Sequence, residues 1–177
     1  NDGCRFDIVG GSKYPVSAKL EEQLRHEISA SGMIDRIVMH GHVRDPQSFY
    51  RQATVLVVPS IFEEPAANVV LEAKSCGVPA IVFPSGGLPE LVNHGTTGWV
   101  CRGRSAADLI EHFTTCVLQP SVCRQMATAC LQETDRRFSE ERYQQQWAGV
   151  YRSEELSDRS AAQTFTDLSL QHKVDSV

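Results

Sequence analysis

Two glutamates eight positions apart, Glu64 and Glu72, are the residues of this 177-residue chain best suited to bind a ligand. Glu64 lies in a loop that follows an apolar segment, and Glu72 lies in the helix predicted to come next. Carboxylates accept hydrogen bonds from vicinal hydroxyl groups, and the first N–H groups of a helix can hold a phosphate without a basic side chain. Eight helical residues rise about 12 Å, which is the scale of a sugar, a diphosphate and a ribose laid end to end.

The apolar pattern of the chain predicts the elements that would position these glutamates. Residues 55–58 are typical of a strand buried on both faces of a parallel sheet. Leu20, Leu24 and Ile28 recur at every fourth residue and predict a helix over residues 18–31. The other predicted strands cover residues 5–9, 37–39, 80–83 and 99–100, and the other predicted helices cover a short segment after Pro46, residues 68–76 and residues 88–92.

Strands that alternate with helices predict an α/β fold, with a Rossmann-like parallel sheet flanked by helices. In such a sheet, ligands bind beyond the carboxyl ends of the strands. The loops at that position cover residues 10–12, 41–44, 60–67 and 84–87. We expect these four loops to line one crevice, with Glu64 and Glu72 on its wall.

The rest of the chain predicts helices over residues 106–118, 121–133 and 139–151, followed by a tail. Tyr143, Trp147 and Tyr151 share one face of the last helix, which indicates a packing surface. Residues 153–177 are polar, so we expect them to be disordered. The sequence therefore predicts one domain over residues 1–152.

The beginning of the chain indicates a piece of a longer protein. Asn1 takes the place of a methionine, and a predicted strand follows almost at once. No signal peptide is recognisable before that strand. We expect the domain to be truncated at its N-terminal edge.

The composition excludes some classes of protein. The net charge of −5 argues against a nucleic-acid binder, which usually has a basic face. No apolar run approaches the roughly 20 residues that span a bilayer. The six cysteines are scattered without C-x-x-C spacing, so we expect them to be reduced and structural in a reducing compartment, the cytoplasm.

The segments around the two glutamates resemble a known family. Glu64 and Glu72 form an E-x7-E motif. The segments that accompany it are V-P-S at 58–60, E-A-K-S-C-G-V-P at 72–79, G-G-L-P-E-L-V at 86–92, G-T-T-G-W-V at 95–100, I-V-G-G-S at 8–12 and H-G-H-V at 40–43. In this order they resemble the donor-binding C-terminal domain of retaining glycosyltransferases with the GT-B fold, especially glycosyltransferase family four, also called glycosyl transferases group 1. The resemblance covers about residues 5–152.

The resemblance implies a role for each site residue. Glu64 would contact the donor sugar as the catalytic carboxylate, and Glu72 would bind the ribose hydroxyls. The amides near Ala67 would face the diphosphate, and His42 and Val43 would lie beside the base. The donor-binding residues implied in this way are Gly10, Gly11, His42, Val43, Glu64, Ala67, Asn68, Val69 and Glu72.

Two departures from the family pattern affect these expectations. The chain has Ala66 and Ala67 where the family often has an aromatic residue and a glycine. The Cβ of Ala67 would keep a phosphate slightly further from the backbone. The Arg and Lys that grip the diphosphate in the family lie upstream of the first strand of this chain, so we expect the chain alone to be inactive.

The resemblance also implies the partners of the complete enzyme. It would transfer a sugar from a nucleoside-diphosphate sugar, with retention, to a glycan or lipid acceptor held by an N-terminal domain that this chain lacks. No metal and no cofactor besides the donor substrate are implied. The enzyme would act in carbohydrate biosynthesis in the cytoplasm, could associate peripherally with a membrane, and would not bind nucleic acid.

Alternative interpretations remain at the level of the sequence. The chain could be a non-catalytic nucleotide-sugar-binding subunit or part of a GT-B sugar-nucleotide epimerase. An NAD-dependent oxidoreductase is disfavoured because residues 10–12 lack the G-x-G-x-x-G fingerprint. His40 and His42 have no further ligands nearby in the sequence, so a metal pair is disfavoured. Glu63 is interpreted as a solvated neighbour of Glu64.

Overall fold

The computed structural model of the chain describes residues 3–11 and 15–152 and confirms the predicted α/β architecture. All of the strand pairings in the described residues are parallel. The strands are β1 (Phe6–Val9), β2 (Ile37–Gly41), β3 (Leu56–Val58), β4 (Ala80–Val82) and β5 (Gly98–Val100). The helices up to residue 138 are α1 (Pro15–Ala30), α2 (Gln47–Tyr50), α3 (Asn68–Ser75), α4 (Leu88–Leu91), α5 (Ala106–Leu118) and α6 (Pro120–Phe138).

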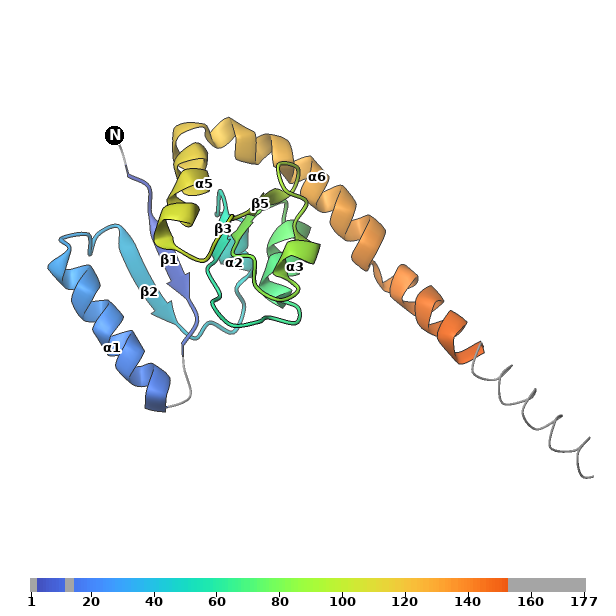
Figure 1. Cartoon of the computed structure of the whole chain (residues 1–177), viewed down its shortest axis with the longest axis horizontal. Coiled ribbons are helices and arrows are strands. Elements are labelled where there is room, and N and C mark those ends of the chain that lie inside the picture. The colour runs from blue at the N-terminus through green and yellow to red at the C-terminus, as the bar shows by residue number, and fades with distance from the viewer. Residues whose placement is uncertain (1–2, 12–14, 153–177) are drawn as a thin grey trace, which may run out of the picture. The chain divides into compact units, whose positions relative to one another are not determined.

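The hydrogen bonds between strands divide them into two sheets, β1–β2 and β3–β4–β5 (Figure 1). We call them the first sheet and the second sheet. In the second sheet, β4 lies between its two neighbours, and Val57 pairs with Ile81, which pairs with Trp99. Because β3, β4 and β5 are parallel, the loops that follow them all leave the second sheet at the carboxyl ends of its strands.

The second sheet is covered on both faces. Ala80 and Val82 of β4 pack in a cluster with residues of α3 and α4, whereas Ile81 packs in a cluster with residues of α5 and α6. All three side chains are fully buried. Lys74 of α3 is also fully buried, and its ammonium group donates to the Leu91 carbonyl at 2.7 Å. Apolar packing on two faces thus fixes the strands whose loops carry the glutamates.

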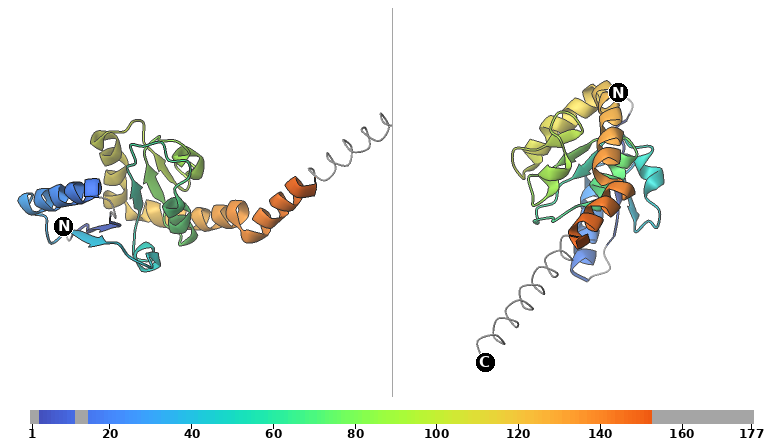
Figure 2. Two further views of the ribbon diagram at one scale, coloured as in Figure 1. Left: turned by 90° about the horizontal axis from the view of Figure 1, so that it is seen from below. Right: turned by 90° about the vertical axis from the view of Figure 1, so that its right-hand side faces the viewer.

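The first sheet is much less covered. Phe6 and Val9 of β1 are each 37% exposed, although their residue types suit a buried strand. Figures 1 and 2 show α1 beside β1 and β2. The Phe6 ring stacks on Phe113 of α5, with ring centroids 4.9 Å apart.

Prolines set the beginnings of two helices that the sequence predicted to start later. The helix predicted from residue 18 begins at Pro15, and the helix predicted from residue 121 begins at Pro120. Proline suits the first position of a helix because the amide proton that it lacks would have no intrahelical acceptor there. The second of these helices also runs on to Phe138, since no Gly or Pro interrupts it.

The chain divides into two compact units, Asn1–Gln132 and Glu133–Val177. In the second unit, residues 140–152 form the predicted last helix. Tyr143, Trp147 and Tyr151 are exposed by 45–62%, and their rings follow one another with centroids 6.0 Å apart. That this face packs against another surface stays a prediction. The tail predicted over residues 153–177 lies outside the described residues.

Two further features of the described residues concern their cysteines and the apolar length of their helices. Cys101, Cys116, Cys123 and Cys130 are buried, and no disulfide bond joins cysteines among the described residues. Within the described ranges, no helix is long and apolar enough to cross a membrane.

Candidate functional site

Glu64 lies in the loop between β3 and α3, at the carboxyl end of β3. Its side chain is half-buried, and its Oε1 accepts a hydrogen bond from the Ser60 hydroxyl at 3.1 Å. After Glu64 the chain continues to Ala67, which precedes α3 in an extended conformation. Ala67 has no side-chain oxygen to cap the helix, and the first N–H groups of a helix lack intrahelical acceptors. The beginning of α3 therefore offers amide donors close to the Glu64 loop.

Glu72 lies on α3 and is held by a residue from another helix. The hydroxyl of Tyr50, at the end of α2, donates to Glu72 Oε2 at 2.9 Å. Tyr50 itself is 8% exposed and packs with Ala73 and Val78. Burial, together with the adjacent carboxylate, raises the pKa of Tyr50 well above its usual value. The tyrosine therefore stays protonated as a donor and orients one oxygen of the exposed Glu72.

The path between the two glutamates differs from the path that the sequence suggested. Only the four steps from Asn68 to Glu72 are helical, so the helix contributes about 6 Å of rise rather than about 12 Å. The residues from Glu64 to Ala67 form a loop, in which Ala67 is extended. The two carboxylates thus lie on different elements, and each has its own anchor.

The turn after β4 packs directly against the Glu64 loop. The Gly87 amide donates to the Glu64 carbonyl at 2.7 Å. A Cβ at Gly86 would lie 2.3 Å from the same carbonyl oxygen, and Gly86 has a φ of +54°. Both the close approach and the backbone conformation require glycine at this position. The tight turn at residues 86–87 therefore contacts the backbone of Glu64 directly.

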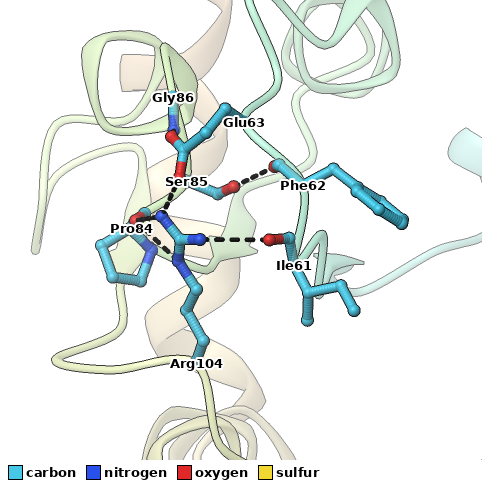
Figure 3. Close-up of polar contacts among 7 residues, drawn as sticks. All are labelled: Ile61, Phe62, Glu63, Pro84, Ser85, Gly86 and Arg104. Carbon is cyan, nitrogen blue, oxygen red and sulfur yellow. Dashed lines mark hydrogen bonds and ion pairs between the residues drawn. The ribbon is translucent and has the colours of Figure 1, made fainter.

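Glu63 is more than a solvated neighbour of Glu64, so that interpretation was wrong. Although its side chain is 67% exposed, it has two partners in Figure 3. Its Oε1 accepts from the Arg104 guanidinium at 2.5 Å, and its Oε2 accepts from the Gly86 amide at 2.6 Å. These two hydrogen bonds, the one from Arg104 first, lower the pKa of Glu63.

Arg104 was missed at the level of the sequence. It follows β5 and directly precedes Ser105, whose side chain forms a capping box with Asp108 at the beginning of α5. The signal that could have found it is its place in the chain. The loop after β5 leaves the same edge of the second sheet as the loops after β3 and β4, but the prediction included only those two.

A second pair of predicted loops meets at the ends of β1 and β2. The Gly10 amide donates to the Gly41 carbonyl at 2.8 Å, and a Cβ at Gly11 would lie 3.2 Å from the His42 amide nitrogen. His42 is exposed, and Val43 is half-buried. Ser12 lies outside the described residues. The structure therefore brings together the four predicted donor-binding residues of this pair of loops.

The neighbouring histidine has a structural partner. His40 Nε2 lies 2.6 Å from the Asp7 carboxylate, and the ring of His40 packs edge-on against Phe49. Among the described residues, no group of three or more His, Cys, Asp or Glu side chains is arranged to hold a metal ion.

The structure therefore joins the predicted loops in two pairs. Residues 10–11 meet loop 41–44 at the first sheet, and loops 60–67 and 84–87 meet at the second sheet. That all four loops line one crevice stays a prediction.

Comparisons with known proteins identify the family of this chain. Residues 1–118 match the family described as glycosyl transferases group 1. A D-inositol 3-phosphate glycosyltransferase of Pseudarthrobacter chlorophenolicus is 33% identical over 127 residues, which are 71% of this chain and 29% of that protein. A GDP-mannose-dependent alpha-(1-6)-phosphatidylinositol monomannoside mannosyltransferase of Mycobacterium tuberculosis is 35% identical over 112 residues, which are 59% of this chain and 28% of that protein. The chain thus spans less than a third of either relative.

Solved structures show the same fold. Sucrose-phosphate synthase from Thermosynechococcus elongatus superposes with a TM-score of 0.75 at 26% identity, over 85% of this chain and 38% of that one. Anabaena HepE, solved in complex with UDP, superposes with a TM-score of 0.78 at 23% identity, over 84% of this chain and 41% of that one. The chain has the α/β fold of one half of a GT-B glycosyltransferase. With its first 118 residues matching the family, the chain belongs to the glycosyl transferases group 1.

Proposed function

We propose that this chain binds a nucleoside-diphosphate sugar and forms the donor side of a glycosyltransferase. The observation that carries the proposal is the arrangement of Glu64 and Glu72. They lie on either side of the beginning of α3, each oriented by a hydroxyl group, from Ser60 and Tyr50 respectively. In the proposed complex, Glu64 accepts hydrogen bonds from the sugar, and Glu72 accepts them from the ribose.

The diphosphate would lie between the two carboxylates, at the beginning of α3. The amides of Ala67, Asn68 and Val69 would donate to its oxygens, helped by the partial positive charge of the helix N-terminus. This placement explains why two carboxylates can flank an anionic ligand, since each contacts a neutral hydroxyl-bearing part of the donor.

The paired loops of the first sheet would complete the donor site. We assign Gly10 and Gly11 to the donor side of the proposed crevice and place His42 and Val43 beside the base. The support is that the Gly10–Gly41 hydrogen bond and the Gly11–His42 approach hold these four residues together at the carboxyl ends of parallel strands.

The relatives differ in the base of the nucleotide that their names give. HepE has been solved with UDP, whereas the mycobacterial relative is GDP-mannose-dependent. The proposed donor is therefore a nucleoside-diphosphate sugar whose base is to be identified by binding measurements.

For the whole protein we propose transfer of the sugar, with retention, to a glycan or lipid acceptor, as in glycosyltransferase family four. Glu64 is the proposed catalytic residue, because hydrogen bonds to the sugar that strengthen in the transition state raise the rate. The proposed reaction uses no metal or other cofactor, and the proposed location is the cytoplasm. Since the chain spans less than a third of its relatives, we expect the 177-residue chain to bind donor weakly and to transfer nothing by itself.

Titration calorimetry on two glutamate variants tests this proposal. Glu72→Ala should weaken binding of both a free nucleotide and its sugar conjugate by about tenfold or more, since a hydrogen bond to a charged group contributes roughly 1.5–3 kcal/mol. Glu64→Ala should weaken binding of the conjugate by a similar factor and spare the free nucleotide. The ligands are UDP, UDP-glucose, GDP and GDP-mannose.

Glu111→Ala is the matched control, because Glu111 is an exposed acid on α5 whose removal changes the net charge equally. It should leave both affinities within about twofold. Equal losses of free nucleotide and conjugate in Glu64→Ala would contradict the role assigned to Glu64.

A further inference from the structure

One arginine joins three loop segments at the edge of the second sheet. The Arg104 guanidinium donates to the Pro84 carbonyl from Nε at 3.2 Å and from Nη2 at 2.9 Å, and Nη1 donates to the Ile61 carbonyl at 3.1 Å. Its Nη2 also donates to the Glu63 carboxylate (Figure 3). We call Arg104 with these three partners, Ile61, Glu63 and Pro84, the Arg104 clasp.

The two loops that Arg104 connects also contact each other directly around Glu64. The Glu63 carboxylate accepts a hydrogen bond from the Gly86 amide, and the Ser85 hydroxyl donates one to the Phe62 carbonyl. The next contact along the two loops is the one from the Gly87 amide to the Glu64 carbonyl. The loops after β3 and β4 are therefore joined by three hydrogen bonds at consecutive residues. Arg104 connects the same two loops through its own hydrogen bonds.

We propose that Arg104 is a positioning residue, which fixes the Glu64 loop against the turn at residues 84–87 and thereby sets the selectivity of the donor site for the sugar. This inference rests on the proposed function, because it takes Glu64 as the residue that contacts the sugar. Glu72 is held separately through Tyr50, so the contact with the ribose does not depend on the Arg104 clasp.

The chemistry of the clasp requires an arginine. A planar guanidinium presents five donors in a fixed fork, whereas a lysine presents one ammonium group on a flexible stem. Two carbonyls and one carboxylate on two loops can be bonded at once only by the fork. Arg102, two residues earlier, is the internal contrast, because it is 84% exposed and its ion pair with Glu111 is long, at 3.8 Å.

Hydrogen exchange of the intact chain tests the structural part of the inference. By NMR, Arg104→Ala should speed exchange of the Gly86 amide about tenfold or more, because Glu63 is released. The Cys101 amide, which bonds the Val82 carbonyl within the second sheet, should not change. Arg102→Ala removes the same charge and should leave both amides unchanged. Arg104→Lys should give an intermediate rate.

Calorimetry on the same variants tests the functional part. Arg104→Ala should raise the Kd of the bound sugar conjugate, UDP-glucose or GDP-mannose, about tenfold while changing the Kd of UDP or GDP less than twofold. Arg104→Lys should recover part of this selectivity. A purely structural role would weaken nucleotide and conjugate alike or leave both unchanged.

The outcomes separate this inference from the proposed function. Unchanged exchange at Gly86 in Arg104→Ala would overturn the Arg104 clasp, whatever the binding data show. Faster exchange with an unchanged ratio of the two affinities would overturn its role in sugar selectivity. If the wild-type chain bound none of the four ligands, the proposed function would be contradicted, and the exchange data would still decide whether the clasp holds the loop.

Discussion

The two sheets of this chain are built from strands of similar apolar character, yet they are buried to different extents. The strand β1 reads F-D-I-V and has three exposed residues and one half-buried residue, whereas β4 reads A-I-V and is fully buried. Helices pack on both faces of the second sheet. Strand formation thus follows the local sequence, whereas burial depends on the elements that pack against the strand. The candidate site residues whose side chains are held by hydrogen bonds belong to the better-covered second sheet.

The largest difference between the two sheets should appear at two glycines with positive φ. At Gly98 of β5 a Cβ would lie 2.0 Å from the Ala80 carbonyl oxygen, whereas at Gly10 after β1 it would meet nothing within 4 Å. Gly98→Ala should prevent the second sheet from forming, because the obstacle is backbone of the adjacent strand. Gly10→Ala should cost only the backbone strain, about 1–3 kcal/mol. Urea unfolding followed by circular dichroism measures both, and equal losses would contradict the difference in packing.

Truncation of one isoleucine in each sheet should give the next largest effect. Ile81→Ala should destabilise the chain by about 2–5 kcal/mol, because it leaves a cavity at a fully buried position. Ile8→Ala, at a half-buried position of β1, should cost about 1 kcal/mol or less. Chemical denaturation of the two variants checks the prediction. A larger loss for Ile8→Ala would show that the first sheet is covered in solution by something outside the described residues.

The smallest predicted effect concerns acid stability of the first sheet. Burial raises the pKa of Asp7, but hydrogen bonds from His40 and then Arg5 outweigh it and leave the pKa below its usual value. A carboxyl group with a lowered pKa in the folded state stabilises the fold above its unfolded pKa and loses that contribution as the pH falls through the folded value. Asp7→Asn should therefore flatten the decline of the urea midpoint below about pH 4. An unchanged slope in the variant would mean that other groups cause the decline.

The sequence was informative wherever local pattern determines structure. The apolar runs predicted all five strands, and the E-x7-E motif placed Glu64 and Glu72 around the beginning of α3. Ends of helices were less predictable, because the helices expected from residues 18 and 121 begin at Pro15 and Pro120. The division into two sheets also could not be foreseen, since hydrogen bonding between strands depends on which edges meet.

The anchors of the site could not be predicted for a related reason. Tyr50 and Glu72 are 22 residues apart, and Glu63 and Arg104 are 41 residues apart. Nothing in the local sequence distinguishes Arg104 from Arg102, and only the folded edge of the second sheet gives one of them three partners. A motif identifies candidate ligand-binding residues, whereas the residues that hold those in place are found from the tertiary structure.

The division into two sheets also affects how the chain behaves at high concentration. Among the five described strands, only β4 has hydrogen-bonded neighbours on both sides. An unpaired edge is a template for a strand from another molecule. The edges of β3 and β5 are three residues long, and short edges resist such addition. The edge of β1 is longer and carries exposed apolar side chains, so self-association of the chain should begin there.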